Sequence, residues 1–119
     1  MNNDLNLVAE FHKKFGSPIL NNPSLIPQDL SDLRYRLMKE EVEEYLLGVK
    51  NGDLENIAKE LADILYTVYG TILEHGLQDK MEDIFQEVHR SNMSKEPTAY
   101  KAKKGLDYFE ADIASILKD

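Results

Sequence analysis

The chain has 119 residues, which is enough for one domain of ordinary size and too few for two comfortable cores. Its 22 acidic residues outnumber its 14 basic residues, and the formal net charge of -8 argues against duplex DNA or RNA as a partner. The absence of cysteine excludes a disulfide scaffold, a thiolate zinc site and a cysteine nucleophile. The first residues lack the pattern of a signal peptide, and no apolar stretch approaches the roughly 18 residues that span a bilayer. We therefore expect a soluble, cytoplasmic protein without a membrane partner.

Hydrophobic side chains recur at helical spacing in five segments, separated by turns rich in glycine, proline and asparagine. In chain order the sequence predicts helices over residues 5–15, 27–50, 54–75, 77–92 and 108–117. Asn51-Gly52-Asp53 is the expected turn between the second and third helices, with Asp53 as the N-cap. The proline-rich stretch 19–27 is expected to be an ordered loop. No segment alternates as a half-buried strand does, so the predicted fold class is an all-α bundle forming a single domain over residues 1–119.

The second predicted helix carries carboxylates where a core should be. Its apolar stripe begins with Leu30, Leu33 and Leu37. At 100° per residue, Glu41 and Glu44 continue that stripe. A second apolar face lies about a quarter turn away and consists of Met38, Val42, Tyr45 and Val49. This is more apolar surface than a small monomer would bury, so we expect a neighbouring subunit to cover part of it.

Counting residues from the turn predicts that four carboxylates meet across the helical hairpin. Glu44 and Glu60 each lie eight residues from Gly52, and Glu41 and Asp63 each lie eleven residues from it. In an antiparallel hairpin these pairs are level and can face each other. Converging ionised carboxylates need cations, and divalent ions with oxygen ligands, Mg²⁺ or Mn²⁺, fit the need. The alternative is a solvated acidic helix face without a metal.

A basic segment follows the fourth predicted helix. Between Arg90 and Lys104 five basic residues face a single acid, Glu96. Such a segment could bind the phosphates of a polyphosphate substrate beside a metal site. The alternative is a frayed, solvated tail.

Several groups of residues together form a recognisable pattern. They are Glu-Glu-x-x-Glu at Glu40, Glu41 and Glu44, Glu60-Leu61-Ala62-Asp63, Arg34-x-Arg36-Leu37, residues 87–95 with Asn92 and Lys95, and Lys104-Gly105-x-x-Tyr108-Phe109. The pattern resembles the MazG-like all-α nucleotide pyrophosphohydrolases, a superfamily that also includes dimeric dUTPases. Beyond the acidic signature, the other groups look like the single-domain branch labelled phosphoribosyl-ATP pyrophosphohydrolase-like. The resemblance covers residues 11–117 and implies a MazG-like helical bundle of four to five helices, completed by oligomerisation.

The resemblance also implies roles for individual residues. The implied metal ligands are Glu41, Glu44, Glu60 and Asp63. Glu40 matches the glutamate that acts as base toward the attacking water. The residues implied in binding phosphate or substrate are Asn92, Lys95, Lys101 and Lys104. The region that holds the base in relatives corresponds here to Phe11, His12 and Phe15, for which core packing is an equal alternative.

The resulting functional hypothesis is a Mg²⁺-dependent enzyme, with Mn²⁺ as a substitute, that cleaves a nucleoside triphosphate to the monophosphate and pyrophosphate. Its role would be house-cleaning of the (d)NTP pool, and it would act as a homodimer or homotetramer. Two alternatives stay open. One is a phosphoribosyl-ATP pyrophosphatase with the same fold, and the other is a helical module that binds a nucleotide without hydrolysing it.

Overall fold

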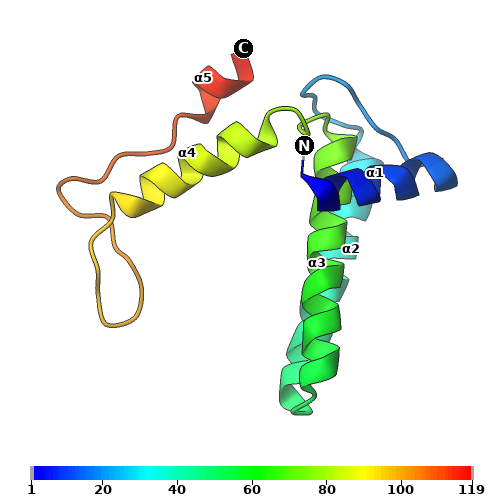
Figure 1. The fold of residues 1–119 in the computed structure, drawn as a ribbon, viewed down its shortest axis with the longest axis horizontal. Coiled ribbons are helices and arrows are strands. Elements are labelled where there is room, and N and C mark those ends of the chain that lie inside the picture. The colour runs from blue at the N-terminus through cyan, green and yellow to red at the C-terminus, as the bar shows by residue number, and fades with distance from the viewer. Residues whose placement is uncertain (1, 119) are drawn as a thin grey trace. The chain divides into compact units, whose positions relative to one another are not determined.

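A computed structural model describes residues 2–118, whose regular elements are all helices (Figure 1). They are α1 (Asn3–Phe15), α2 (Gln28–Lys50), α3 (Leu54–Glu74), α4 (Met81–Met93) and α5 (Ile113–Lys118). The all-α fold class is therefore confirmed. The chain divides into two compact units, residues 1–77 and 78–119, and each is described by itself; the single domain stays a prediction. No helix within residues 2–118 is both long enough and apolar enough to cross a membrane.

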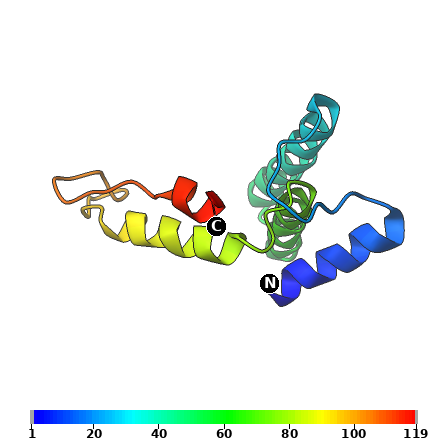
Figure 2. The same cartoon turned by 90° about the horizontal axis from the view of Figure 1, so that it is seen from above.

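Helices α2 and α3 form an antiparallel hairpin and lie side by side in both views (Figures 1 and 2). The predicted turn is present: Gly52 has φ +63°, and the Asp53 side chain accepts a hydrogen bond of 3.1 Å from the Asn56 amide. Near the turn the helices approach closely, because a Cβ atom at Gly48 would lie 3.3 Å from the Ile57 side chain. The hairpin is the rigid element that carries the predicted carboxylates.

Helix α1 packs against α3. Its first amides are capped by Asn2, whose side chain accepts a 2.7 Å hydrogen bond from the Leu5 amide, and it ends at Gly16 with φ +74°. One face of α1 is buried and consists of Leu5, Val8, Ala9 and His12. Beside this face the helix stays exposed, with Leu7, Phe11 and Phe15 spaced four residues apart.

The stretch between α1 and α2 is an ordered loop, as predicted. Its backbone is tied to the end of α3 by hydrogen bonds from the Leu20 amide to the Leu73 carbonyl, 3.1 Å, and from the Ser24 amide to the His75 carbonyl, 2.9 Å. Gly76 has φ +66°, and any side chain there would collide with the Asn22 carbonyl. These contacts fix the loop without secondary structure of its own.

In the second unit, α4 and α5 begin later than the sequence predicts. Helix α4 starts at Met81 rather than Leu77. The last helix, expected from Tyr108, starts at Ile113, because the backbone of Phe109 is used by α4. Its carbonyl accepts from the Ser91 hydroxyl at 2.8 Å, and its amide donates to the Ser94 hydroxyl at 3.1 Å. The intervening chain is therefore extended along α4 instead of helical.

Candidate metal centre

Three carboxylates meet across the α2–α3 hairpin. Glu41 extends from α2, and Glu60 and Asp63 extend from α3. Each offers an oxygen atom, and these oxygens all lie within 4.8 Å of one another. Glu60 is buried, whereas Glu41 and Asp63 are half-buried. Glu44, one turn along α2, is exposed and shares a side-chain hydrogen bond with Glu60 that raises the pKa of Glu44.

The protein alone leaves these carboxylates poorly satisfied. Burial raises the pKa of Glu41 to about 7, aided by its hydrogen bond with Glu60 and by the neighbouring charges of Glu44 and Asp63. Two carboxylates can share a hydrogen bond only if one of them holds a proton. Even so, the Oε2 atoms of Glu41 and Glu60 are buried without a hydrogen-bond partner. A buried charged oxygen without a partner carries a large free-energy penalty, so these oxygens fit the coordination of a cation.

Lys59 is the one basic side chain within residues 2–118 that forms a salt bridge with this centre. Its Nζ atom lies 2.7 Å from Asp63 Oδ2 and 3.7 Å from Glu60 Oε1, and the contact with Asp63 raises the pKa of the lysine. The lysine side chain is 68% exposed, so much of its charge is screened by water. The donor set is therefore three or four carboxylates, and the solvated ammonium of Lys59 lies beside it. All-oxygen donors of this kind fit Mg²⁺, Ca²⁺ or Mn²⁺.

The neighbouring glutamates of α2 lie outside the cluster. Glu40 is exposed beside Glu41, turned 100° around the helix. Glu43 is also exposed, and its only ion pair in the described chain is a long contact of 3.8 Å with Lys39. Glu40 is thus a solvated carboxylate next to the cluster, and Glu43 lies on the solvent face.

A comparison with models of known protein families finds a match. The model of the phosphoribosyl-ATP pyrophosphohydrolase family matches residues 8–92, which include every carboxylate of the centre. The chain belongs to this family. It is a pyrophosphohydrolase, a hydrolase acting on phosphorus-containing anhydrides, and the MazG-like resemblance of the sequence is confirmed. A search of curated proteins finds no match to the chain.

The aromatic residues expected at the base site of the pyrophosphohydrolase do not share one surface with His12. Phe11 and Phe15 are exposed, and their ring centroids are 4.6 Å apart. Phe11 also meets the edge of Tyr66 at 5.5 Å, so Tyr66 extends this aromatic cluster onto α3. His12 is buried, and its Nδ1 donates to the Pro18 carbonyl at 3.0 Å. The sequence reasoning missed Tyr66, which lies three residues after Asp63.

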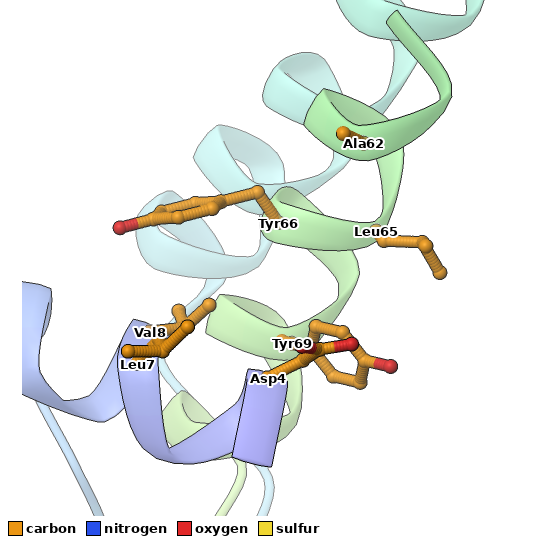
Figure 3. A pocket seen from close by; sticks show the side chains of 7 residues that line it. All are labelled: Asp4, Leu7, Val8, Ala62, Leu65, Tyr66 and Tyr69. Carbon is orange, nitrogen blue, oxygen red and sulfur yellow. The ribbon is translucent and has the colours of Figure 1, made fainter. Parts of the chain in front are cut away.

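A pocket of about 210 Å³ lies between α1 and α3 of the pyrophosphohydrolase (Figure 3). It is mainly apolar and is lined by Asp4, Leu7, Val8, Ala62, Leu65, Tyr66 and Tyr69. Tyr69 follows Glu60 by nine residues, which is half a turn away around α3. The pocket therefore opens on the side of α3 opposite Glu60 and is separate from the carboxylate cluster.

The remaining predicted residues of the pyrophosphohydrolase belong to the second unit. Asn92 lies in the last turn of α4, and its carbonyl accepts from the Lys95 amide at 3.1 Å. Beyond it the chain forms a loop closed by the antiparallel bridge between Glu96 and Lys103. Lys101 is exposed on this loop and Lys104 is exposed directly after it, and the Lys104 ammonium lies 5.1 Å from the Tyr108 ring. Both lysines are thus solvent-accessible cations.

Proposed function

We propose that the chain is a Mg²⁺-dependent nucleoside triphosphate pyrophosphohydrolase, which converts a (d)NTP to the monophosphate and pyrophosphate. The observation that carries this proposal is the cluster of Glu41, Glu60 and Asp63, whose oxygens lie within 4.8 Å of one another. Two buried oxygens of this cluster have no hydrogen-bond partner, and a bound cation would satisfy them. The family membership supplies the reaction class.

In this proposal Glu41, Glu60 and Asp63 hold Mg²⁺ together with Glu44, and Mn²⁺ can replace it. The donor set fits, because hard divalent cations prefer carboxylate oxygens. When bound, the metal neutralises phosphate charge and lowers the pKa of a nearby water. Lys59 then screens the outer side of the cluster, where it already contacts Asp63 at 2.7 Å.

The proposed reaction breaks one anhydride bond. The oxygen of a water molecule forms a bond to the α-phosphorus, the bond from that phosphorus to the bridging oxygen breaks, and pyrophosphate leaves. Glu40 accepts the proton of the water, a role that its exposed carboxylate next to Glu41 allows. The residues proposed to bind the phosphates are Asn92, Lys95, Lys101 and Lys104.

The base and the quaternary structure complete the proposal. Phe11 and Phe15 offer exposed rings for stacking a nucleobase, and the buried His12 supports the helix that carries them. Apolar side chains exposed on the hairpin include Val42, Leu46, Val49, Leu61 and Leu65. We propose that a second copy of the chain covers this surface in a homodimer or homotetramer, since monomers rarely leave so much apolar surface in water.

A substrate screen tests the proposal directly. The purified protein is incubated with each (d)NTP and with Mg²⁺ or Mn²⁺, and the monophosphate, pyrophosphate and orthophosphate are resolved. We expect monophosphate and pyrophosphate in equal amounts, and no turnover when the metal is chelated. Release of orthophosphate from every triphosphate would overturn the proposal.

A second candidate is phosphoribosyl-ATP as the substrate, which the name of the matching family favours. Including phosphoribosyl-ATP in the screen separates the two candidates, as does the ability of the gene to support a strain that requires histidine. A third candidate is a module that binds nucleotide without hydrolysis. It predicts that the unmodified protein has no turnover and that Glu41→Gln leaves nucleotide binding intact, whereas the enzyme requires that this change abolish metal binding and turnover.

A further inference from the structure

A buried ion pair links α2 and α3 away from the carboxylate cluster. Arg34 lies on α2, seven residues before Glu41, and Glu74 lies in the last turn of α3. Arg34 Nη1 is 2.9 Å from Glu74 Oε2, and the two side chains are only 10% and 3% exposed. A carboxylate buried to this extent is tolerated because a cation of the protein itself pairs with it.

The same guanidinium makes two further hydrogen bonds to α3. Arg34 Nε donates to Thr71 Oγ1 at 3.1 Å, and Nη2 donates to the Thr67 carbonyl at 3.0 Å. With Glu74, the three acceptors occupy successive turns along one face of α3. Because the guanidinium is planar and its donors point in fixed directions, it satisfies all three only at one position along the α3 axis.

Gly70 provides the space that this arrangement needs. A Cβ atom there would lie 2.5 Å from Arg34 Nη2 and 3.0 Å from His12 Nε2. Glycine in a helix interior lowers stability relative to alanine, so its presence here accompanies a close approach of α1 and α2 to α3. His12, fixed by the Pro18 carbonyl, closes the other side of this space.

The buried positions of α2 are spaced by heptads around Glu41. Within α2 the two buried residues are Arg34 and Gly48, and each lies seven residues from Glu41. Seven residues are nearly two full turns, so all three positions face α3. Gly48 allows close contact with Ile57 near the turn. A glycine has no side chain to interlock with its neighbours, so this contact sets the distance between the two helices but not the position of α2 along the α3 axis. The Glu41 level itself brings like charges together, which pushes the helices apart.

We propose that Arg34 is a positioning residue that sets the register of α2 along α3 and so holds Glu41 level with Glu60 and Asp63. It touches neither the metal nor the substrate. Its consequence for Mg²⁺ binding rests on the proposed function, whereas the register is a property of the metal-free hairpin.

The double variant Arg34→Met/Glu74→Met tests this proposal, because it removes both buried charges and leaves neither unpaired. We expect it to stay folded with an unchanged or higher urea midpoint. Its affinity for Mn²⁺, measured by titration calorimetry, should fall about 10- to 100-fold, the usual cost of losing support behind a metal ligand. Arg34→Lys should not restore the affinity, since it keeps the charge without the planar donors. Arg36→Met, an exposed neighbour on α2, is the matched control and should bind Mn²⁺ like the unmodified protein.

A distance measurement decides the register without metal. The chain has no cysteine, so spin labels on Glu43→Cys and Ala58→Cys, both exposed, report the placement of α2 on α3. The labelled protein is diluted with unlabelled protein to remove distances between molecules. We expect one narrow distribution with Arg34 and Glu74 in place, and a broadened or shifted one in the double variant. An unchanged distribution in the double variant overturns the inference, whatever the Mn²⁺ affinity.

Two further outcomes are informative. If the unmodified protein binds no Mn²⁺, the proposed function fails, and the distance measurement alone decides the register. Should the double variant not fold, Gly70→Ala replaces it in both experiments, because a methyl group there displaces Arg34 Nη2 while keeping both charges. The same broadened distribution is expected, and an unchanged one overturns the inference.

Discussion

The α2–α3 hairpin buries carboxylates in two places, and only one of these places has a buried cation of the protein beside it. Toward the end of α3, Glu74 pairs with Arg34 at 2.9 Å, and each nitrogen of the guanidinium contacts an acceptor on α3. Nearer the turn, Glu41 and Glu60 each leave a buried oxygen without a partner. The protein supplies a buried cation at the first place and only the exposed Lys59 at the second. This difference is the basis of the proposal that a cation from solution completes the cluster of Glu41, Glu60 and Asp63.

In the proposed arrangement the carboxylate cluster depends on the Arg34–Glu74 ion pair. Pairing with arginine fixes direction and register, whereas a cluster of like charges has no preferred register of its own. The Arg34–Glu74 pair can therefore hold the carboxylates of Glu41, Glu60 and Asp63 close together before any metal binds. Such a division would let the carboxylate cluster keep poorly satisfied oxygens while the ion pair keeps the two helices aligned.

Removing only the arginine should produce the largest change in stability. In Arg34→Met, Glu74 keeps its charge in a buried position without its partner, which costs about 3–5 kcal/mol of unfolding free energy. Urea unfolding of the metal-free variant measures the loss. The exposed Arg36→Met should stay within about 0.5 kcal/mol of the unmodified protein. A loss of unfolding free energy below about 1 kcal/mol for Arg34→Met would contradict the view that Glu74 depends on its buried partner.

Removing a carboxylate from the cluster should have the opposite effect on stability. Glu60→Gln takes one charge from a buried, repelling group, so the metal-free variant should be at least as stable as the unmodified protein. The thermal shift on adding Mg²⁺ should disappear, and pyrophosphohydrolase activity should fall at least about 100-fold, beyond the usual cost of changing a residue that only supports a ligand. Glu43→Gln, on the solvent face of α2, is the control that should keep both. A Glu60→Gln variant that still shows the thermal shift with Mg²⁺ would contradict the proposal that Glu60 helps to bind the ion.

Much of the cluster could be predicted from the sequence, because rigid helices preserve residue counts. Counting from Gly52 places Glu41 level with Asp63, and the turn with its Asp53 cap lies where the sequence predicts it. The helical spacing alone could also have separated His12 from Phe11, since neighbouring residues point 100° apart. These features depend on the fixed geometry of a helix, so they can be counted from the sequence.

The ion pair between Arg34 and Glu74 could not be predicted in the same way. Arg34 was recognisable only as part of a motif, and nothing near Glu74 in sequence identifies it as the partner. The heptad spacing of Arg34, Glu41 and Gly48 is the signal that could have indicated it. The late start of α5 was equally hidden, because Ser91 and Ser94 bind the backbone of Phe109 from a distant part of the chain. Tertiary hydrogen bonds override local helical preference there.

The affinity for Mg²⁺ should depend on pH through Glu41. In the metal-free protein its pKa is about 7, and Mg²⁺ must displace that proton. The affinity should therefore rise about tenfold between pH 6 and pH 8 and level off above that, as measured by calorimetry in two buffers of different ionisation enthalpy. Proton release on binding should be largest at pH 6. Equal affinity and no proton release at pH 6 would mean that Glu41 is already ionised without metal.

Glu87 offers the smallest and most selective test, because it is a carboxylate whose cation the protein supplies. Hydrogen bonds from Arg90, at 2.7 and 2.9 Å, and from the Asp112 amide lower its pKa to about 2. Its contribution to stability is thus complete above pH 4.5 and is lost as the pH falls toward 2. The gap between the urea midpoints of the unmodified protein and Glu87→Gln should be constant above pH 4.5 and close below it. Glu82→Gln, exposed on the same helix, should show no such gap.

Glu41 predicts the reverse slope in the adjoining range, because its pKa is raised rather than lowered. Between about pH 4.5 and 7 the folded metal-free protein holds a proton that the unfolded chain has released, so stability falls as the pH rises. Saturating Mg²⁺ should remove this fall, because the bound ion keeps Glu41 ionised in the folded protein. It should leave the gap between the unmodified protein and Glu87→Gln unchanged below pH 4.5, since Arg90 already neutralises Glu87. If Mg²⁺ also altered that gap, it would be acting on the net charge of the chain. A change that spares the gap identifies the cluster as the place where a cation from solution replaces an arginine.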